Sequence, residues 1–376
     1  MPTLSEAVAR FPLVPRPRPT CRPLPQRTRN LTALAQSAAD TKNPVTASSV
    51  YNQAALLASD AGLPQLAAEL CHKHAHAYLH AAPLSAETAI RALEPVVNLA
   101  RLQLRAQHGD VGLGLLLGLF EAVTSSTALR FADVVVPADL VRTAAARQEV
   151  RAWLWRILLA DGSRALTAAG LWNDALAHVR EHQGIGARML DGRQIAVVAS
   201  LTNGETATAA ELIARTEPGD PWEAAVTACL HALCHRATVG LDQSEKNELA
   251  NTVLAIPSQP GTVLFGVRLA LAALNAVDTG PAADRIVHAL HRRITLASDG
   301  VAAREAHGDP QFRALATKKE LESCQDLVEA CGLGSGELPA PLRRGLVGAV
   351  EISDQVIRRS LREGAMARAD TPRLGS

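Results

Sequence analysis

The sequence has few aromatic residues, few lysines and no long hydrophobic run. Its 376 residues include only four tryptophans, two tyrosines and five phenylalanines, although 48% of the residues are hydrophobic. The core-forming residues are therefore mostly alanine, leucine and valine, a composition that favours closely packed helices. The most apolar run, Val111 to Val123, is too short to cross a bilayer. We therefore expect an all-α protein that makes no use of a membrane.

An excess of charge of one sign is also missing. The chain has 38 Lys and Arg against 37 Asp and Glu, a formal net charge of +1. This balance argues against a large nucleic-acid-binding surface, so we expect no nucleic-acid partner. Only five of the cations are lysines, a bias typical of proteins from GC-rich bacterial genomes, and we assign it no function.

The six cysteines show no CxxC spacing. In a chain of this size they are typical of reduced, mostly buried thiols in a cytosolic protein. The N-terminus lacks the apolar region of a signal peptide, so we expect a cytoplasmic location. The cysteines are Cys21, Cys71, Cys229, Cys234, Cys324 and Cys331.

Two glycine-led motifs stand 34 positions apart in the middle of the chain. The first, GLWNDA, begins at Gly170, and the second, GETATA, begins at Gly204. A glycine suits the end of a first helix, where a left-handed residue is preferred. The alanine five positions later suits a close crossing of two helices. Thirty-four residues is also the period of the tetratricopeptide repeat, a helix–turn–helix unit.

Over roughly residues 55–240 the chain thus resembles tetratricopeptide-type proteins. Weaker copies begin at Gly62 and Gly109, with spacings of 47 and 61 residues to the first glycine of the next copy. The resemblance implies an α-solenoid of helical hairpins with a concave groove for a peptide or another protein. The overall pattern is also similar to helical-repeat proteins of actinobacteria, which implies an architecture but no activity. The alternative is a generic bundle in which Gly-x-x-x-x-Ala simply ends antiparallel hairpins.

Residues 1–29 are predicted to form a Pro/Arg-rich tail. Positions 10–29 hold six arginines and six prolines, and proline at this density prevents helix formation. Such a tail is either disordered or lies on the surface. A second interpretation is a docking arm for an acidic or aromatic-lined surface of a partner.

The remainder is predicted as two further parts. Residues 30–331 form the helical-repeat domain, with an irregular insertion near 126–142 and a Gly/Asp/Pro break over 299–311. Residues 332–376 form a linker, a C-terminal capping helix and a disordered tail.

Histidines recur four positions apart on the predicted helices. Such pairs share one helix face and can chelate zinc. The alternative is half-exposed histidines that stack or form hydrogen bonds, and none of the pairs has the HExxH pattern of zinc hydrolases. We expect no cofactor. His72, His76 and His80 are the first candidates for a metal site, and the other pairs are His178/His182 and His231/His235.

The most polar segment in the middle of the chain is EHQGIGARMLDGRQ, residues 181–194. Met189 takes the third glycine position of GxGxxG and no strand precedes it, so the dinucleotide-binding fingerprint fails. We predict a turn between repeats whose side chains contact a ligand or partner; the alternative is capping and ion pairing between hairpins. The candidate binding residues are Arg151, His182, Arg188, Asp191 and Arg193.

No catalytic motif is present. The sequence has no P-loop, no GxSxG elbow, no metalloprotease motif and no DDxxD cluster. The sequence therefore favours a non-catalytic scaffold or a peptide-binding or protein-binding accessory subunit. Such a subunit would present a peptide to partner enzymes of a biosynthetic or regulatory complex. The alternatives are an enzyme whose site is assembled from distant helices and a sensor that responds to a small molecule or metal.

Overall fold

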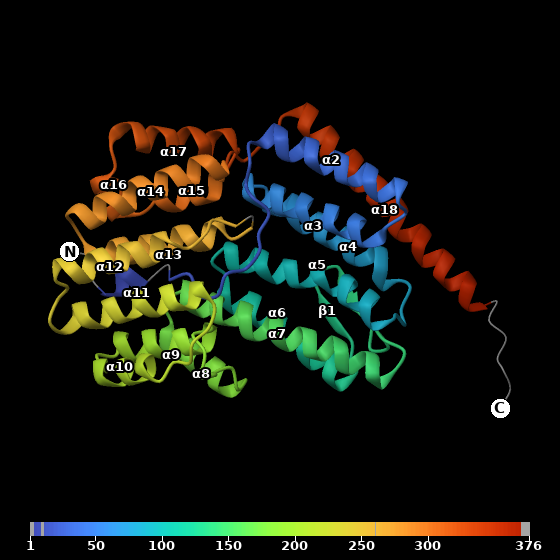
Figure 1. Ribbon diagram of the computed structural model, residues 1–376. Helices are drawn as coiled ribbons and strands as arrows, with labels where there is room; N and C mark the ends of the chain where they lie inside the picture. Colours follow the sequence, from blue (N-terminus) through green and yellow to red (C-terminus); the bar gives the residue numbers. More distant parts are fainter. Residues whose placement is uncertain (1–3, 9–10, 260, 370–376) are drawn as a thin grey trace. The chain divides into compact units, whose positions relative to one another are not determined.

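The computed structural model describes residues 4–8, 11–259 and 261–369. They are mostly helical, with a short two-stranded hairpin, so the prediction of an all-α protein is confirmed (Figure 1). In the part of the chain that is described, no helix is both long enough and apolar enough to cross a membrane.

The chain divides into two compact units rather than the single repeat domain predicted over 30–331. Unit 1 consists of residues 1–23 and 162–333, and unit 2 consists of residues 24–161 and 334–376. The predicted domains were continuous stretches of the chain, whereas each observed unit combines two stretches that are far apart in the sequence. In the structure, the predicted capping helix packs on the first helices of unit 2 and belongs to their core.

Unit 2 is organised around the packing of its last helix on its first. The elements of unit 2 are α2 (Leu24–Asp40), α3 (Pro44–Asp60), α4 (Pro64–Leu79), α5 (Ala86–Arg105), α6 (Gly109–Ser125), β1 (Leu129–Phe131), β2 (Val134–Val136), most of α7 (Ala144–Ala168) and α18 (Ala340–Ala369). Helix α18 lies along α2 and also contacts α3 and α4 (Figure 1). It buries Leu346, Ala349, Val350, Ser353 and Ile357, which recur at helical spacing on one face.

Helix α2 begins inside the predicted tail. Leu24, Thr28 and Leu31 are buried at spacings of four and three, so residues 24–29 already form a helix face. Pro25 falls in the first turn, where a proline removes no helical hydrogen bond. At the other end of the chain, α18 continues to Ala369, within the predicted disordered tail.

The predicted insertion near 126–142 contains the hairpin β1–β2. Its strands pair antiparallel, with Arg130 opposite Val135. Val134 and Val136 are buried while Val135 between them is exposed, the alternation of a strand with one covered face.

Unit 1 is a succession of short helices. Its elements are α1 (Leu4–Val8), α8 (Trp172–Glu181), α9 (Asp191–Thr202), α10 (Thr206–Ala214), α11 (Pro221–Thr238), α12 (Gln243–Leu254), α13 (Val263–Val277), α14 (Pro281–Ala297), α15 (Gly300–His307), α16 (Pro310–Leu315) and α17 (Lys318–Ala330). From α8 to α15 each helix packs on the next, and α9, α11, α13 and α15 also contact one another in that order. The colours from green to orange in Figure 1 follow this order.

The left-handed turns predicted at Gly170 and Gly204 are present, with φ of +75° and +78°. At Gly170 the N–H donates to Thr167 O, and the N–H of Leu171 donates to Leu166 O. This pair of bonds satisfies carbonyls that the helix end leaves free. Gly62 makes the same turn. Gly109 does not, because Gln107 takes the left-handed position and Gly109 opens α6 instead.

Replacement of Gly170 by alanine is expected to lower the free energy of unfolding by about 1 kcal/mol, because an L residue is strained at this φ. No atom lies within 4 Å of the added Cβ, so backbone strain is the whole effect. The measurement is amide hydrogen exchange at the α7–α8 junction. Gly114, a helical position in α6 that is equally open, is the control, and its replacement by alanine is expected to stabilise its helix. Unchanged exchange in Gly170→Ala would contradict this reason for the glycine.

Residues 11–22, the Pro/Arg-rich segment, lie along unit 1 without helix. Phe11, Leu13 and Cys21 are buried. The N–H of Val14 donates to Asp191 Oδ1 at 2.7 Å, and Gly300 N donates to Cys21 O at 2.8 Å. Of the two predictions for the tail, this segment fits the one in which the tail lies on the protein surface, and it is also partly buried there. Residues 1–3 and 9–10 of the predicted tail lie outside the described residues.

The Gly/Asp/Pro break predicted over 299–311 is wrong, because α15 and the start of α16 occupy it. Asp299 caps α15 by accepting hydrogen bonds from Val301 N and Ala302 N. Gly300 allows close packing rather than a break: an added Cβ would come within 2.6 Å of Cys331 Sγ.

Candidate functional site

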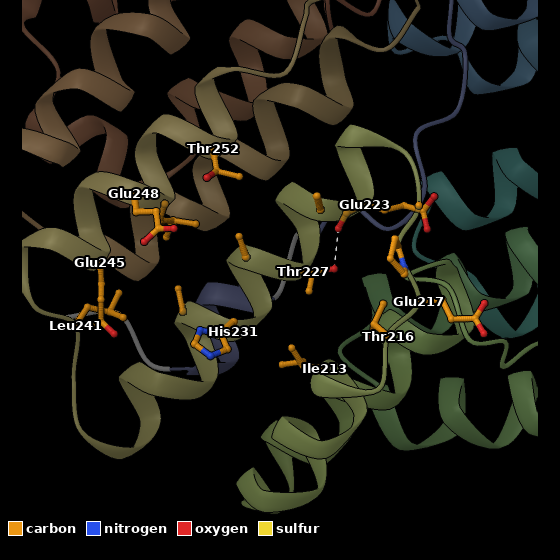
Figure 2. Close-up of a pocket in the computed structure, with 16 residues that line it drawn as sticks. Ile213, Thr216, Glu217, Glu223, Thr227, His231, Leu241, Glu245, Glu248 and Thr252 are labelled. Atoms are coloured by element: carbon orange, nitrogen blue, oxygen red, sulfur yellow. Dashed lines mark hydrogen bonds between the residues drawn. The ribbon is translucent and has the colours of Figure 1, made fainter.

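The candidate site is an open groove in unit 1, between the end of α10, α11 and α12. Its volume is about 570 Å³. Figure 2 shows Glu245, Glu248 and Thr252 on one side of the groove and Thr216 and Glu217 on the other. A volume of this size is in the range of ligand-binding sites in proteins.

Helix α11 forms the floor of the groove. Ala224, Thr227, Ala228 and His231 line it at the spacing i, i+3, i+4 and i+7, so they occupy one face of the helix. Three of these four side chains are small. A ligand can therefore approach the helix closely along most of the floor, and His231 limits it at one end.

The start of α11 is held by a capping box. Asp220 is the N-cap, and its N–H donates a hydrogen bond to Oε1 of the Glu223 side chain at 3.0 Å. Pro221 occupies the first turn, where its fixed φ suits a helix. The capping residues of this first turn therefore fix where α11 begins and the direction in which it runs along the groove.

Helix α12 forms one wall and begins with a second capping box. Gly240, with φ of +87°, ends α11, and Asp242 accepts a hydrogen bond from Glu245 N at 2.9 Å. In return, Oε2 of the Glu245 carboxylate accepts a hydrogen bond from Asp242 N at 2.8 Å. From this start Glu245, Glu248 and Thr252 fall on the face of α12 that lines the groove.

The groove is acidic. Four glutamates and one histidine line it, with no lysine or arginine among its lining residues. Glu217 and Glu248 are exposed, and their carboxylates have no hydrogen-bond or ion-pair partner within the described ranges. Glu245 Oε1 lies 2.9 Å from Nδ1 of His235. Two carboxylates on opposite walls are thus free to meet a cationic ligand.

Glu223, the fourth glutamate, is occupied by Arg188. Arg188 donates from Nε to Glu223 Oε2 at 3.2 Å and from Nη2 to Glu223 Oε1, and it also reaches Asp220 Oδ2 at 3.0 Å. Burial raises the pKa of Glu223, but the hydrogen bonds from Arg188 and Asp220 outweigh it and leave the pKa below its ordinary value. Arg188 therefore acts on the groove by holding the capping box of α11.

Arg193 fastens the polar segment to the other wall of the groove. It is buried, and its guanidinium donates to Leu212 O, Thr216 Oγ1 and Gly186 O at distances between 2.8 and 3.2 Å. Arg193 thus satisfies carbonyls at the end of α10 and in the loop before α9. For Arg193 these contacts correspond to the alternative interpretation of the polar segment, in which its side chains cap neighbouring helices and do not contact a ligand.

The other predicted binding residues are not among those that line the groove. Asp191 faces the N-terminal segment, where it accepts from Val14 N and lies 3.5 Å from Arg16. His182 packs with its ring centroid 4.6 Å from that of His178. Arg151 is exposed on α7 in unit 2, whereas the other four belong to unit 1.

Of the three histidines proposed for a metal site, His72 and His76 lie on α4 and His80 is its C-cap. His72 Nδ1 lies 4.0 Å from Asp133, and His80 Nδ1 lies 2.8 Å from the backbone oxygen of His76. Within residues 4–8, 11–259 and 261–369, no group of three or more His, Cys, Asp or Glu side chains is placed so that it could hold a metal ion.

The sequence interpretation missed Glu217, Glu245 and Glu248. Their signal is weak because the three are spread over a loop and a helix, and exposed glutamates are common on helices. The feature that could have indicated an exposed, shallow helix face is the i, i+3, i+4, i+7 pattern from Ala224 to His231, in which the first three residues are small.

Comparison with known proteins found no matching family model, no matching curated protein and no matching solved structure.

Proposed function

We propose that this protein binds an extended, positively charged peptide segment of another protein in the groove on α11. The proposal makes it a non-catalytic binding subunit. The succession of helices from α8 to α15, in which α9, α11, α13 and α15 contact one another, supports a solenoid of tetratricopeptide-like hairpins for unit 1. In such solenoids a face of stacked helices binds peptides.

The single observation that carries the proposal is the acidic groove itself. Its glutamates stand on both sides, Glu217 on one and Glu245 with Glu248 on the other, and the Glu217 side chain extends outward at the rim (Figure 2). Charges set apart in this way suit a ligand with more than one cationic group, such as a peptide with several arginines or lysines. The whole chain has a net charge of only +1, so the attraction is local to the groove.

The lining also suits a peptide backbone. Thr216, Thr227 and Thr252 place hydroxyl groups along the groove, and the alanines between them leave room for a main chain. Thr227 already donates to Glu223 O at 2.8 Å, which leaves its oxygen lone pairs to accept from a ligand N–H. An extended peptide carries such N–H groups at regular intervals.

The test is fluorescence anisotropy with a labelled octapeptide of alternating alanine and arginine. The wild-type protein is expected to bind it, and Glu217→Gln/Glu248→Gln is expected to bind about ten-fold more weakly, since each exposed ion pair contributes up to about 1 kcal/mol. Both side chains are exposed and without partners in the described part of the chain, so the double variant keeps the fold.

Two controls make the result specific. Glu181→Gln/Glu329→Gln removes the same charge from exposed positions of unit 1 outside the groove, and we expect wild-type affinity. An octapeptide of alternating alanine and glutamate is expected not to bind. Equal affinity of the arginine peptide for both double variants would refute the groove as its site.

A further inference from the structure

A second hollow in unit 1 has the opposite charge. It lies between the end of α12, the start of α13 and the last turns of α14, and its volume is about 520 Å³. Arg22, Arg292 and Arg293 line it, and no acidic residue is among its lining residues. This hollow is separate from the acidic groove and shares no lining residue with it.

The fold fixes the backbone next to Arg22 and the side chain of Arg293. Cys21 is buried and its carbonyl accepts a hydrogen bond from Gly300 N at 2.8 Å. These contacts hold the backbone in place immediately before Arg22. Arg293 passes over Gly266, where an added Cβ would lie 2.9 Å from Nη1. Its Nη2 donates to Ile256 O at 2.9 Å, which anchors the side chain at the end of α12.

The other two arginines remain free to bind an anion. Arg22 and Arg292 are exposed, and their guanidinium groups have no hydrogen-bond or ion-pair partner within the described residues. Burial and the charge of Arg292 lower the pKa of Arg293, the effect expected when like charges gather without a counter-ion. An oxyanion between them would relieve this repulsion and accept several charge-assisted hydrogen bonds.

One part of the hollow is apolar, and Thr20, Ser258 and Gln259 add polar groups to its lining. Leu254, Val263 and Leu296 line it, and Leu296 leaves 81% of its surface exposed to water. A large exposed leucine next to unpaired arginines favours a ligand with an apolar part. The volume suits a small molecule of drug-like size.

We propose that this hollow binds a small amphipathic anion, an oxyanion carried on a short apolar chain. The arginines hold the oxyanion, and Leu296 with its neighbours covers the chain. The proposal does not depend on the peptide-binding function, since the two hollows share no residue.

Isothermal titration calorimetry of the full chain with octyl phosphate tests it, at concentrations too low for micelles. We expect one site per chain. Inorganic phosphate, which lacks the apolar part, and octanol, which lacks the charge, are each expected to bind at least ten-fold more weakly. Equal binding of inorganic phosphate would overturn the amphipathic assignment.

Arg22→Gln and Arg292→Gln are each expected to weaken octyl phosphate binding about ten-fold, because each removes a charged donor. Arg304→Gln is the matched control, since Arg304 is exposed in the same unit and does not line the hollow. Wild-type affinity in both test variants would overturn the proposal. So would binding to vesicles that contain phosphatidylserine without binding of octyl phosphate, because the ligand would then be a membrane surface.

Discussion

Replacement of Arg193 by methionine is expected to lower the free energy of unfolding of unit 1 by about 3 kcal/mol. Methionine keeps an apolar stem of similar length but removes the donors to Leu212 O, Thr216 Oγ1 and Gly186 O. Hydrogen bonds from a charged group contribute about 1.5–3 kcal/mol each, and buried carbonyls left without a donor carry a further penalty. The bonds share one guanidinium, so their contributions do not add in full.

The same change is expected to loosen the groove. Thr216 and Glu217 form one of its walls, and Arg193 holds the end of α10 from which that wall continues. Arg193→Met should therefore weaken binding of the arginine octapeptide, although Arg193 does not line the groove.

Amide hydrogen exchange of peptides from α9 and α10 measures the effect within unit 1. Arg215→Met is the matched control, because Arg215 is exposed and its guanidinium pairs with Glu211 one helical turn away. We expect this control to change the free energy of opening by less than about 0.5 kcal/mol. Exchange in Arg193→Met that equals the control would show that the guanidinium does not hold the segment.

Acidification from pH 7.5 to 4.5 is expected to cost unit 2 about 3 kcal/mol through His74 alone. His74 is buried and stacks on Tyr51, with ring centroids 4.8 Å apart and planes within 5°. Its Nε2 has no hydrogen-bond partner within the described ranges. Burial lowers the pKa of His74 from its usual 6.5 to about 3, although the charge of Asp354 acts in the opposite direction.

The sign of the effect follows from proton binding. Between pH 6.5 and 3 the unfolded chain binds a proton at His74 and the folded chain does not. Stability is therefore complete above pH 6.5 and falls by about 1.4 kcal/mol for each pH unit below it. The loss reaches its limit near pH 3, where the folded state also takes up the proton.

His74→Phe keeps an aromatic ring against Tyr51 and removes the titrating group. The free energy of opening of α3 and α4, from hydrogen exchange, should fall less steeply between pH 6.5 and 4.5 in this variant than in the wild type. His76→Gln, at an exposed position of the same helix, should keep the wild-type slope. Parallel slopes for His74→Phe and the wild type would contradict a buried neutral histidine.

Much of the helical structure could be predicted from local signals. Gly170 and Gly204 mark left-handed helix ends because an L side chain is strained there. Asn43 and Pro44 are the usual signals of a helix start, and Asn43 caps α3 by accepting a hydrogen bond from Val45 N. The break predicted over 299–311 failed because Gly300 serves close packing against Cys331, which is 31 residues away and gives no local signal.

The candidate site was harder to predict than the helices. Arg188 and Arg193 were chosen for their polarity, but each makes contacts that hold the groove wall or its capping box. The exposed carboxylates Glu217 and Glu248 resemble ordinary surface residues until the fold sets them on opposite sides of one groove. Sequence spacing predicts which residues share a helix face, and not which faces of different helices enclose a space.

The sequence by itself determined that this protein is built of helices and that left-handed turns end helices at Gly170 and Gly204, because propensity and glycine conformation act within a few residues. Only the tertiary structure decided that residues 340–369 join residues 24–40 in one core and that the chain forms two units. It also decided that opposite charges gather in two separate hollows of unit 1. These features depend on contacts between residues far apart in the chain. Burial of apolar surface supplies the free energy of such contacts, but it is non-directional, and the local sequence does not specify which distant residues will meet.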